Sequence, residues 1–154
     1  MAETNEANSY LEETKRLQNE AVNTLLAQAL SEKEYADAQT DASLQSTNRS
    51  GYADYMDYVN PYGTQSESLA ASGLSHSGAA EKSYAQGYNA YQSALSKAAS
   101  AAQGAKDETN QSYLSTLAQG NAQKLTNEAD YYQNLYDNFW NQKQMDYYNS
   151  LLKD

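Results

Sequence analysis

The single proline, Pro61, constrains this chain more than any other residue. A proline inside a helix costs about 3 kcal/mol, so the two long proline-free flanks are both able to be helical. Pro61 stands in the turn sequence Asn60-Pro61-Tyr62-Gly63, and a Gly/Ser-rich stretch extends from there to Gly78. We therefore predict an all-α fold: a long antiparallel helical hairpin or coiled-coil-like bundle, with an ordered central elbow containing a short helix.

Capping signals divide the chain into three segments. Residues 1–50 predict an N-terminal amphipathic helix, with Ser9 as candidate N-cap and Gly51 as candidate stop. Residues 51–78 predict the elbow, in which residues 52–59 either continue the first helix or form a separate short one. Thr64 to Glu67 have capping-box spacing, and Gly73 follows as a stop. The residues expected to shape the elbow are Asn60, Pro61, Gly63, Gly73 and Gly78.

Residues 79–154 predict the helical return, and apolar residues three and four apart mark candidate packing stripes. The stripe weakens at residues 104–111, which predicts a bend or phase shift there; one straight helix with a polar stretch is the alternative. The stripes are Tyr10, Leu11, Thr14, Leu17, Ala21, Leu25, Gln28 and Ala29 in the first helix, then Tyr84, Tyr88, Tyr91, Leu95, Ala98, Ala102 and Ala105, then Leu114, Leu117, Asn121, Leu125, Glu128, Tyr132, Leu135 and Phe139.

The composition predicts a small private core. Hydrophobic residues make up 40% of the 154, but fifteen are tyrosines, and phenylalanine and tryptophan occur once each. A single domain of this size without isoleucine, with a mean hydropathy of -0.90, lacks the large aliphatic side chains that usually fill a core. We expect a homo-oligomer, because an isolated monomer would be marginally stable.

Tyrosine suits contacts that are partly wet, since its ring is apolar and its hydroxyl can stay hydrated. The tyrosines are therefore candidates for an intersubunit interface, although packing within the chain is the simpler interpretation. The candidate interface residues are Tyr84, Tyr88, Tyr91, Tyr132, Tyr136, Phe139, Trp140 and Tyr147.

Charge and residue types argue against several classes of function. A net charge of -10 has the wrong sign for binding phosphate backbones, so we expect no direct nucleic-acid binding. No stretch is apolar enough for a transmembrane segment, and the polar N-terminus does not resemble a secretory signal. The chain has no cysteine, and His76 has no neighbours with metal-ligand spacing. We expect no catalytic residues, no metal and no cofactor, and hence no enzyme.

Two sequence motifs resemble those of uncharacterised helical proteins from bacteriophages and prophages of Gram-positive gut bacteria. These proteins pair an N-P-Y-G elbow, here residues 60–63, with an L-A-x-x-G-L-x-x-S-G loop, here residues 69–78. The similarity covers roughly residues 50–95 and includes Y-N-A-Y-Q at residues 88–92. It carries no catalytic residues over to this chain.

The resemblance implies a non-enzymatic structural component of a phage particle, in the tail, the connector or the interior. Such a protein would be made in the host bacterial cytoplasm, located in the virion, and bound to copies of itself and to other virion proteins. The alternatives are a phage assembly or scaffolding factor and, less in keeping with the sequence, a secreted helical-hairpin effector.

Overall fold

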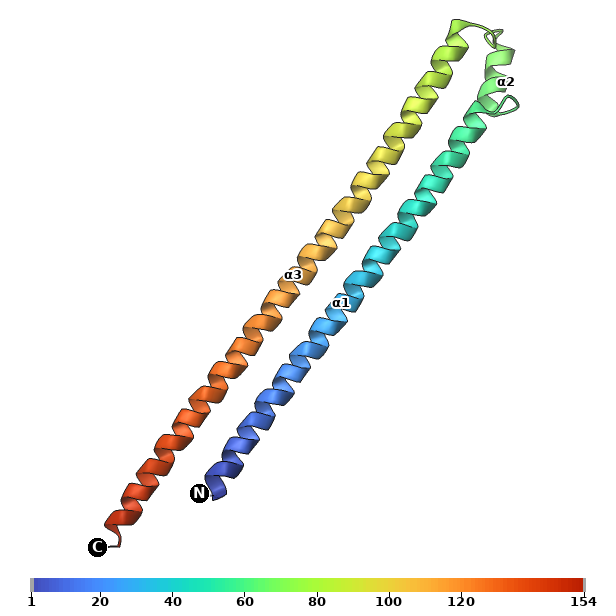
Figure 1. Cartoon of the computed structure of the whole chain (residues 1–154). Coiled ribbons are helices and arrows are strands. Elements are labelled where there is room, and N and C mark those ends of the chain that lie inside the picture. Colours follow the sequence, from blue (N-terminus) through green and yellow to red (C-terminus); the bar gives the residue numbers. More distant parts are fainter. Residues whose placement is uncertain (1, 154) are drawn as a thin grey trace. The chain divides into compact units, whose positions relative to one another are not determined.

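A computed structural model describes residues 2–153 (Figure 1). Along the chain it contains α1 (Ala2–Val59), α2 (Thr64–Ala71) and α3 (Gly78–Leu151). The described residues form helices and turns, with no strand among them. Because α1 and α3 pack antiparallel and α2 lies in the connection, the predicted all-α helical hairpin with a helical elbow is confirmed.

The chain divides into two compact units, each an antiparallel helix pair. The first unit is Met1–Glu32 with Gln111–Asp154, where Asn19 contacts Asn127 and the side chain of Leu26 lies against Gly120. The second unit is Lys33–Asn110 and includes α2. In the second unit Asp41 pairs with Lys106, and the ring of Tyr58 meets that of Tyr84. In both units, later residues of α1 contact earlier residues of α3, so the two helices of each pair run antiparallel.

Helix α1 is longer at both ends than the capping signals predicted. It begins at Ala2, so Ser9 lies inside the helix and the predicted N-cap is wrong. It also passes through Gly51 and ends at Val59, which makes residues 52–59 a continuation of the first helix. One interior glycine costs only about 1 kcal/mol relative to alanine, too little to stop a helix whose neighbours are packed.

The turn around Pro61 is held by close backbone contacts. Asn60 Oδ1 accepts a hydrogen bond from the Tyr62 N–H at 3.0 Å, and the Gly63 N–H donates to the Asn60 carbonyl at 2.9 Å. Gly63 is buried, and a Cβ at this position would stand 2.1 Å from the Asp57 carbonyl oxygen. The turn therefore needs glycine at residue 63 for space, since α2 begins directly on top of the end of α1.

Helix α2 starts without the predicted capping box but ends at the predicted stop. Its N-cap is Gly63, with no side-chain cap hydrogen bond, so the capping role predicted for Thr64 is wrong. Its C-terminus follows the prediction: Gly73 has a φ of 75°, the Gly73 N–H donates to Ala70 O, and the Leu74 N–H donates to Leu69 O. These two bonds form a Schellman motif, which favours glycine at the left-handed position.

Helix α3 runs without interruption through residues 104–111, so this stretch is part of one helix, and the bend or phase shift predicted there stays a prediction. A Cβ added at Gly104 would meet nothing within 4 Å, which means that this glycine makes no close approach to another element. A polar stretch leaves a helix intact because its backbone hydrogen bonds are internal.

Candidate self-association surface

The core inside the chain is small. Among the described residues, the buried hydrophobic side chains are those of Val22, Leu69 and Ala80, and none of the large side chains is fully buried. The rest of the contact between α1 and α3 consists of partly buried side chains. Such a contact stabilises each helix pair modestly, because the hydrophobic contribution scales with the apolar area removed from water.

Residues that pack between α1 and α3 recur every eleven positions. The partly or fully buried residues include Leu11, Val22, Lys33, Leu44 and Tyr55 on α1, and Tyr91, Ala102, Tyr113, Lys124 and Leu135 on α3. Eleven residues make three turns at 3.67 residues per turn, close to the 3.6 of a straight helix. Part of the same contact also recurs every seven residues, as at Lys15, Val22 and Ala29 on α1 and at Leu117, Lys124 and Tyr131 on α3.

The observed burial differs from the predicted stripe on α1. Tyr10, Leu17 and Leu25 are 71%, 51% and 62% exposed, so the first predicted stripe lies largely outside the helix pair. Leu11, Thr14 and Ala29 of the same stripe are partly buried, and Val22, which the stripe did not include, is buried. The sequence carried two overlapping periodicities on α1, and the spacing alone did not reveal which one faces α3.

Six tyrosines of the second unit form an aromatic cluster next to the elbow. The rings of Tyr55 and Tyr91 are stacked with centroids 4.8 Å apart. Tyr58 meets the edge of Tyr84, and its hydroxyl contacts Ser83 Oγ at 2.8 Å and donates to Ser83 O at 2.9 Å. The remaining ring contacts are Tyr52 with Tyr91 and Tyr55 with Tyr88. Tyr84 and Tyr91 thus pack within the chain, as the simpler interpretation had it, whereas Tyr88 is 49% exposed.

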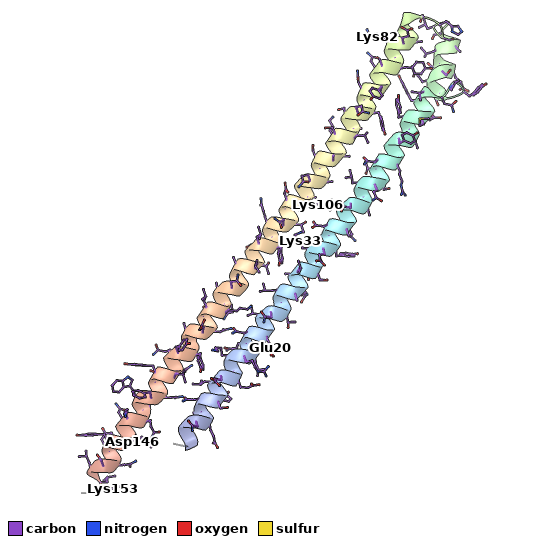
Figure 2. The ribbon with its side chains drawn as sticks, in the orientation of Figure 1. Glu20, Lys33, Lys82, Lys106, Asp146 and Lys153 are labelled. Atoms are coloured by element: carbon purple, nitrogen blue, oxygen red, sulfur yellow. The ribbon has the colours of Figure 1, made fainter. Side chains whose placement is uncertain are left out.

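Farther from the elbow, the second unit packs through small and charged residues. Lys33 and Lys106 lie on facing sides of α1 and α3 (Figure 2). Lys106 Nζ is 2.6 Å from Asp41 Oδ1 on the other helix, and Lys33 Nζ is 2.6 Å from Asp37 Oδ2. Beside them runs a groove of about 610 Å³, lined mainly by alanine, serine and threonine side chains. This stretch has few large apolar contacts.

The first unit is held by polar contacts in its centre. Asn127 is buried, its Nδ2 donates to Asn19 Oδ1 at 3.1 Å, and its Oδ1 accepts from Gln123 at 3.0 Å. Nearer the termini, Lys15 Nζ lies 4.0 Å from the centroid of the Tyr131 ring, and the Tyr131 hydroxyl donates to Glu12 at 3.3 Å. Partial burial and the Glu12 carboxylate raise the pKa of Tyr131.

The aromatic residues predicted at the end of α3 lie on its surface. Tyr132, Tyr136, Phe139, Trp140 and Tyr147 are each between 50% and 63% exposed. Phe139 and Tyr136 both contact Trp140 by ring edges, so three of these side chains form one continuous aromatic surface. The structure places these five predicted interface residues where a second molecule can reach them.

Further exposed apolar residues were not named as interface candidates. They include Tyr10, Leu17 and Leu25 on α1, and Leu114 and Leu125 on α3. All five belong to the predicted stripes. They were not named as interface residues because the stripes were assigned to packing within the chain.

The surface of α1 is acidic, with one clear charge network. Arg16 pairs with both Glu13 and Glu20, one turn away on either side. The Arg16 guanidinium lowers the pKa of Glu13, and the two carboxylates raise the pKa of Arg16. These side chains are more than half exposed, so the network is screened by water and salt.

Within residues 2–153, no three or more histidine or carboxylate side chains are grouped to hold a metal ion. His76 is exposed in the loop before α3. Over the same residues, none of the helices has the length and apolarity that crossing a membrane requires. Comparisons of the chain with protein-family models, curated proteins and solved structures found no match.

Proposed function

We propose that this chain is a non-enzymatic structural protein that works by helical self-association, as a component of a bacteriophage particle. The observation that carries the proposal is the amount of surface left uncovered. The described chain exposes 11416 Å². A compact monomer of 17.0 kDa would expose about 7,700 Å².

The kind of surface matters as much as its area. Soluble monomers expose single apolar side chains commonly, but rarely whole rows of them. Here large aromatic and aliphatic side chains are exposed along both α1 and α3. Covering them with other subunits would supply the apolar burial that the helix pairs do not provide alone.

The placement in a phage particle rests on the sequence resemblance of the elbow, residues 60–63 and 69–78. A protein that acts by helical association suits a tail, connector or internal virion component, where many copies pack together or against other virion proteins. Synthesis in the host bacterial cytoplasm and location in the virion follow from this assignment.

Quantitative mass spectrometry of purified phage particles encoding this sequence tests the assignment. We expect the chain in mature particles, at a copy number in fixed ratio to the major structural proteins. Presence in assembly intermediates and absence from mature particles would replace it with the scaffolding function. Absence from both, with the protein free outside the cell, would favour a secreted effector.

A further inference from the structure

The first unit carries two outer rows of residues whose large apolar side chains are exposed. The outer α1 seam consists of Tyr10, Thr14, Leu17, Ala21 and Leu25, spaced three or four residues apart. The outer α3 seam consists of Leu114, Ala118, Leu125, Tyr132 and Phe139, in which the last four are seven residues apart. In both seams the large apolar side chains, those of Tyr10, Leu17, Leu25, Leu114, Leu125, Tyr132 and Phe139, are at least 51% exposed.

The spacing of the outer seams suits a partner helix. Tyr10 and Leu17 are seven residues apart on α1, as are Ala118, Leu125, Tyr132 and Phe139 on α3. A seven-residue repeat keeps an apolar row in register with a partner helix that winds around it.

The two outer seams open on opposite sides of the helix pair. Thr14, a member of the outer α1 seam, lines a groove together with Asp130 and Asn134 of α3. Asp130 precedes the partly buried Tyr131, and Tyr132 follows it. Successive helical residues are 100° apart, so Tyr132 lies on the side of Tyr131 away from that groove. A contact made by one seam therefore leaves the other free.

The charges beside the seams disfavour contact between two outer α1 seams. Glu6, Glu13 and Glu20 follow the outer α1 seam at seven-residue spacing, with Arg16 offsetting part of their charge. Beside the outer α3 seam the bases Lys124 and Lys143 balance the acids Glu128 and Asp146, and Lys124 is partly buried. Two α1 seams packed antiparallel would set rows of glutamate against each other, whereas the outer α3 seam presents no such row to an α1 seam.

We propose that the outer α1 seam of one copy packs on the outer α3 seam of a second copy. The proposal rests on the self-association proposed above and names its contact. Because the two seams differ and face opposite ways, each copy binds two neighbours, and the assembly grows into a ring or an open filament. A standard interface removes about 800 Å² from each partner, so two per copy fit within the excess exposed surface.

Two variants that each lose one seam test the contact. Leu17→Glu places a charge in the outer α1 seam, and Phe139→Glu places one in the outer α3 seam. By sedimentation velocity we expect each variant alone to be a monomer, with association weakened on the order of 100-fold. An equimolar mixture should form a one-to-one dimer and nothing larger, because each variant supplies the seam that the other lacks.

Controls separate loss of the contact from loss of the fold. Gln119→Glu adds the same charge to α3 outside its outer seam and should assemble like the wild type. Circular dichroism checks the helix content of every variant; if a first variant unfolds, Leu25→Glu with Tyr132→Glu forms a second pair on more exposed residues.

The possible results distinguish failure of the proposed contact from failure of the proposed function. A wild-type chain that is a monomer overturns both this contact and the proposed function. A wild-type assembly with a mixture that stays monomeric, or with a single variant that still dimerises alone, overturns only the pairing of α1 with α3.

Discussion

At the scale of the residue, Gly87 decides how closely α1 and α3 approach beside the elbow. A Cβ at this position would lie 2.2 Å from Cε1 of Tyr58, whose hydroxyl is already held by Ser83. The ring of Tyr58 thus packs directly on the backbone of α3. Gly104, in the same helix, has no such role, because a methyl group added there would have nothing within 4 Å.

The two glycines give opposite predictions for one substitution. Gly87→Ala should destabilise the fold by about 1–3 kcal/mol, because Tyr58 must leave its place. Gly104→Ala should stabilise it by about 0.5–1 kcal/mol, because alanine is the better helix former and its methyl group meets nothing. Urea denaturation followed by circular dichroism measures both; equal effects of the two substitutions would contradict the close packing of Tyr58.

The ion pair between Arg16 and Glu13 gives a pH-dependent prediction. Because the folded-state pKa of Glu13 is lowered, its stabilising contribution is present above the ordinary pKa of 4.5 and is lost as pH falls through the lowered value. Glu13→Gln should therefore lower the melting temperature at pH 7 and leave it unchanged at pH 2. Glu6→Gln, which removes the same charge, is the control; an equal effect of both would show general charge repulsion instead.

At the scale of the element, the buried amide pair of Asn19 and Asn127 fixes the alignment of α1 on α3 in the first unit. Asn127 is 5% exposed and is bonded on both sides of its amide. A buried polar pair contributes little net stability, but it penalises any alignment that separates the partners. It is well suited to setting the register of two helices whose other contacts are small and polar.

Single and double replacement of this pair should have different consequences. Asn127→Ala should cost about 1–3 kcal/mol, because Asn19 loses its donor inside the contact. Replacing both residues by leucine should recover that stability and weaken the preference for one alignment. Denaturant unfolding reports the stability, and the width of the distance distribution between spin labels on α1 and α3 reports the alignment. An unchanged stability in Asn127→Ala would contradict a register role.

The limits of the sequence as a guide also show at this scale. Pro61 and Gly73 revealed the hairpin and the end of α2, because each acts through its own backbone conformation. Gly51 was misleading as a stop, since a glycine with φ in the helical range costs little inside a long helix. Which of the two stripes on α1 faces α3 depends on the match with the other helix, and residue spacing along one helix does not contain that information.

At the scale of the whole molecule, the chain has much helix and little core. Its helices bury few large side chains against each other, and polar atoms such as Asn48 Oδ1 are buried without a hydrogen-bond partner. Both features lower the stability of a single copy. Covering the exposed apolar rows with other copies would supply the apolar burial that a single copy lacks. The small core and the proposed association therefore have the same cause.

Sedimentation equilibrium of the purified full chain over a wide concentration range tests this account most directly. We predict species larger than the 17.0 kDa monomer, and a melting temperature that rises with protein concentration as the outer surface becomes covered. A chain that stays monomeric at every concentration, with a sharp melting transition independent of concentration, would contradict the account.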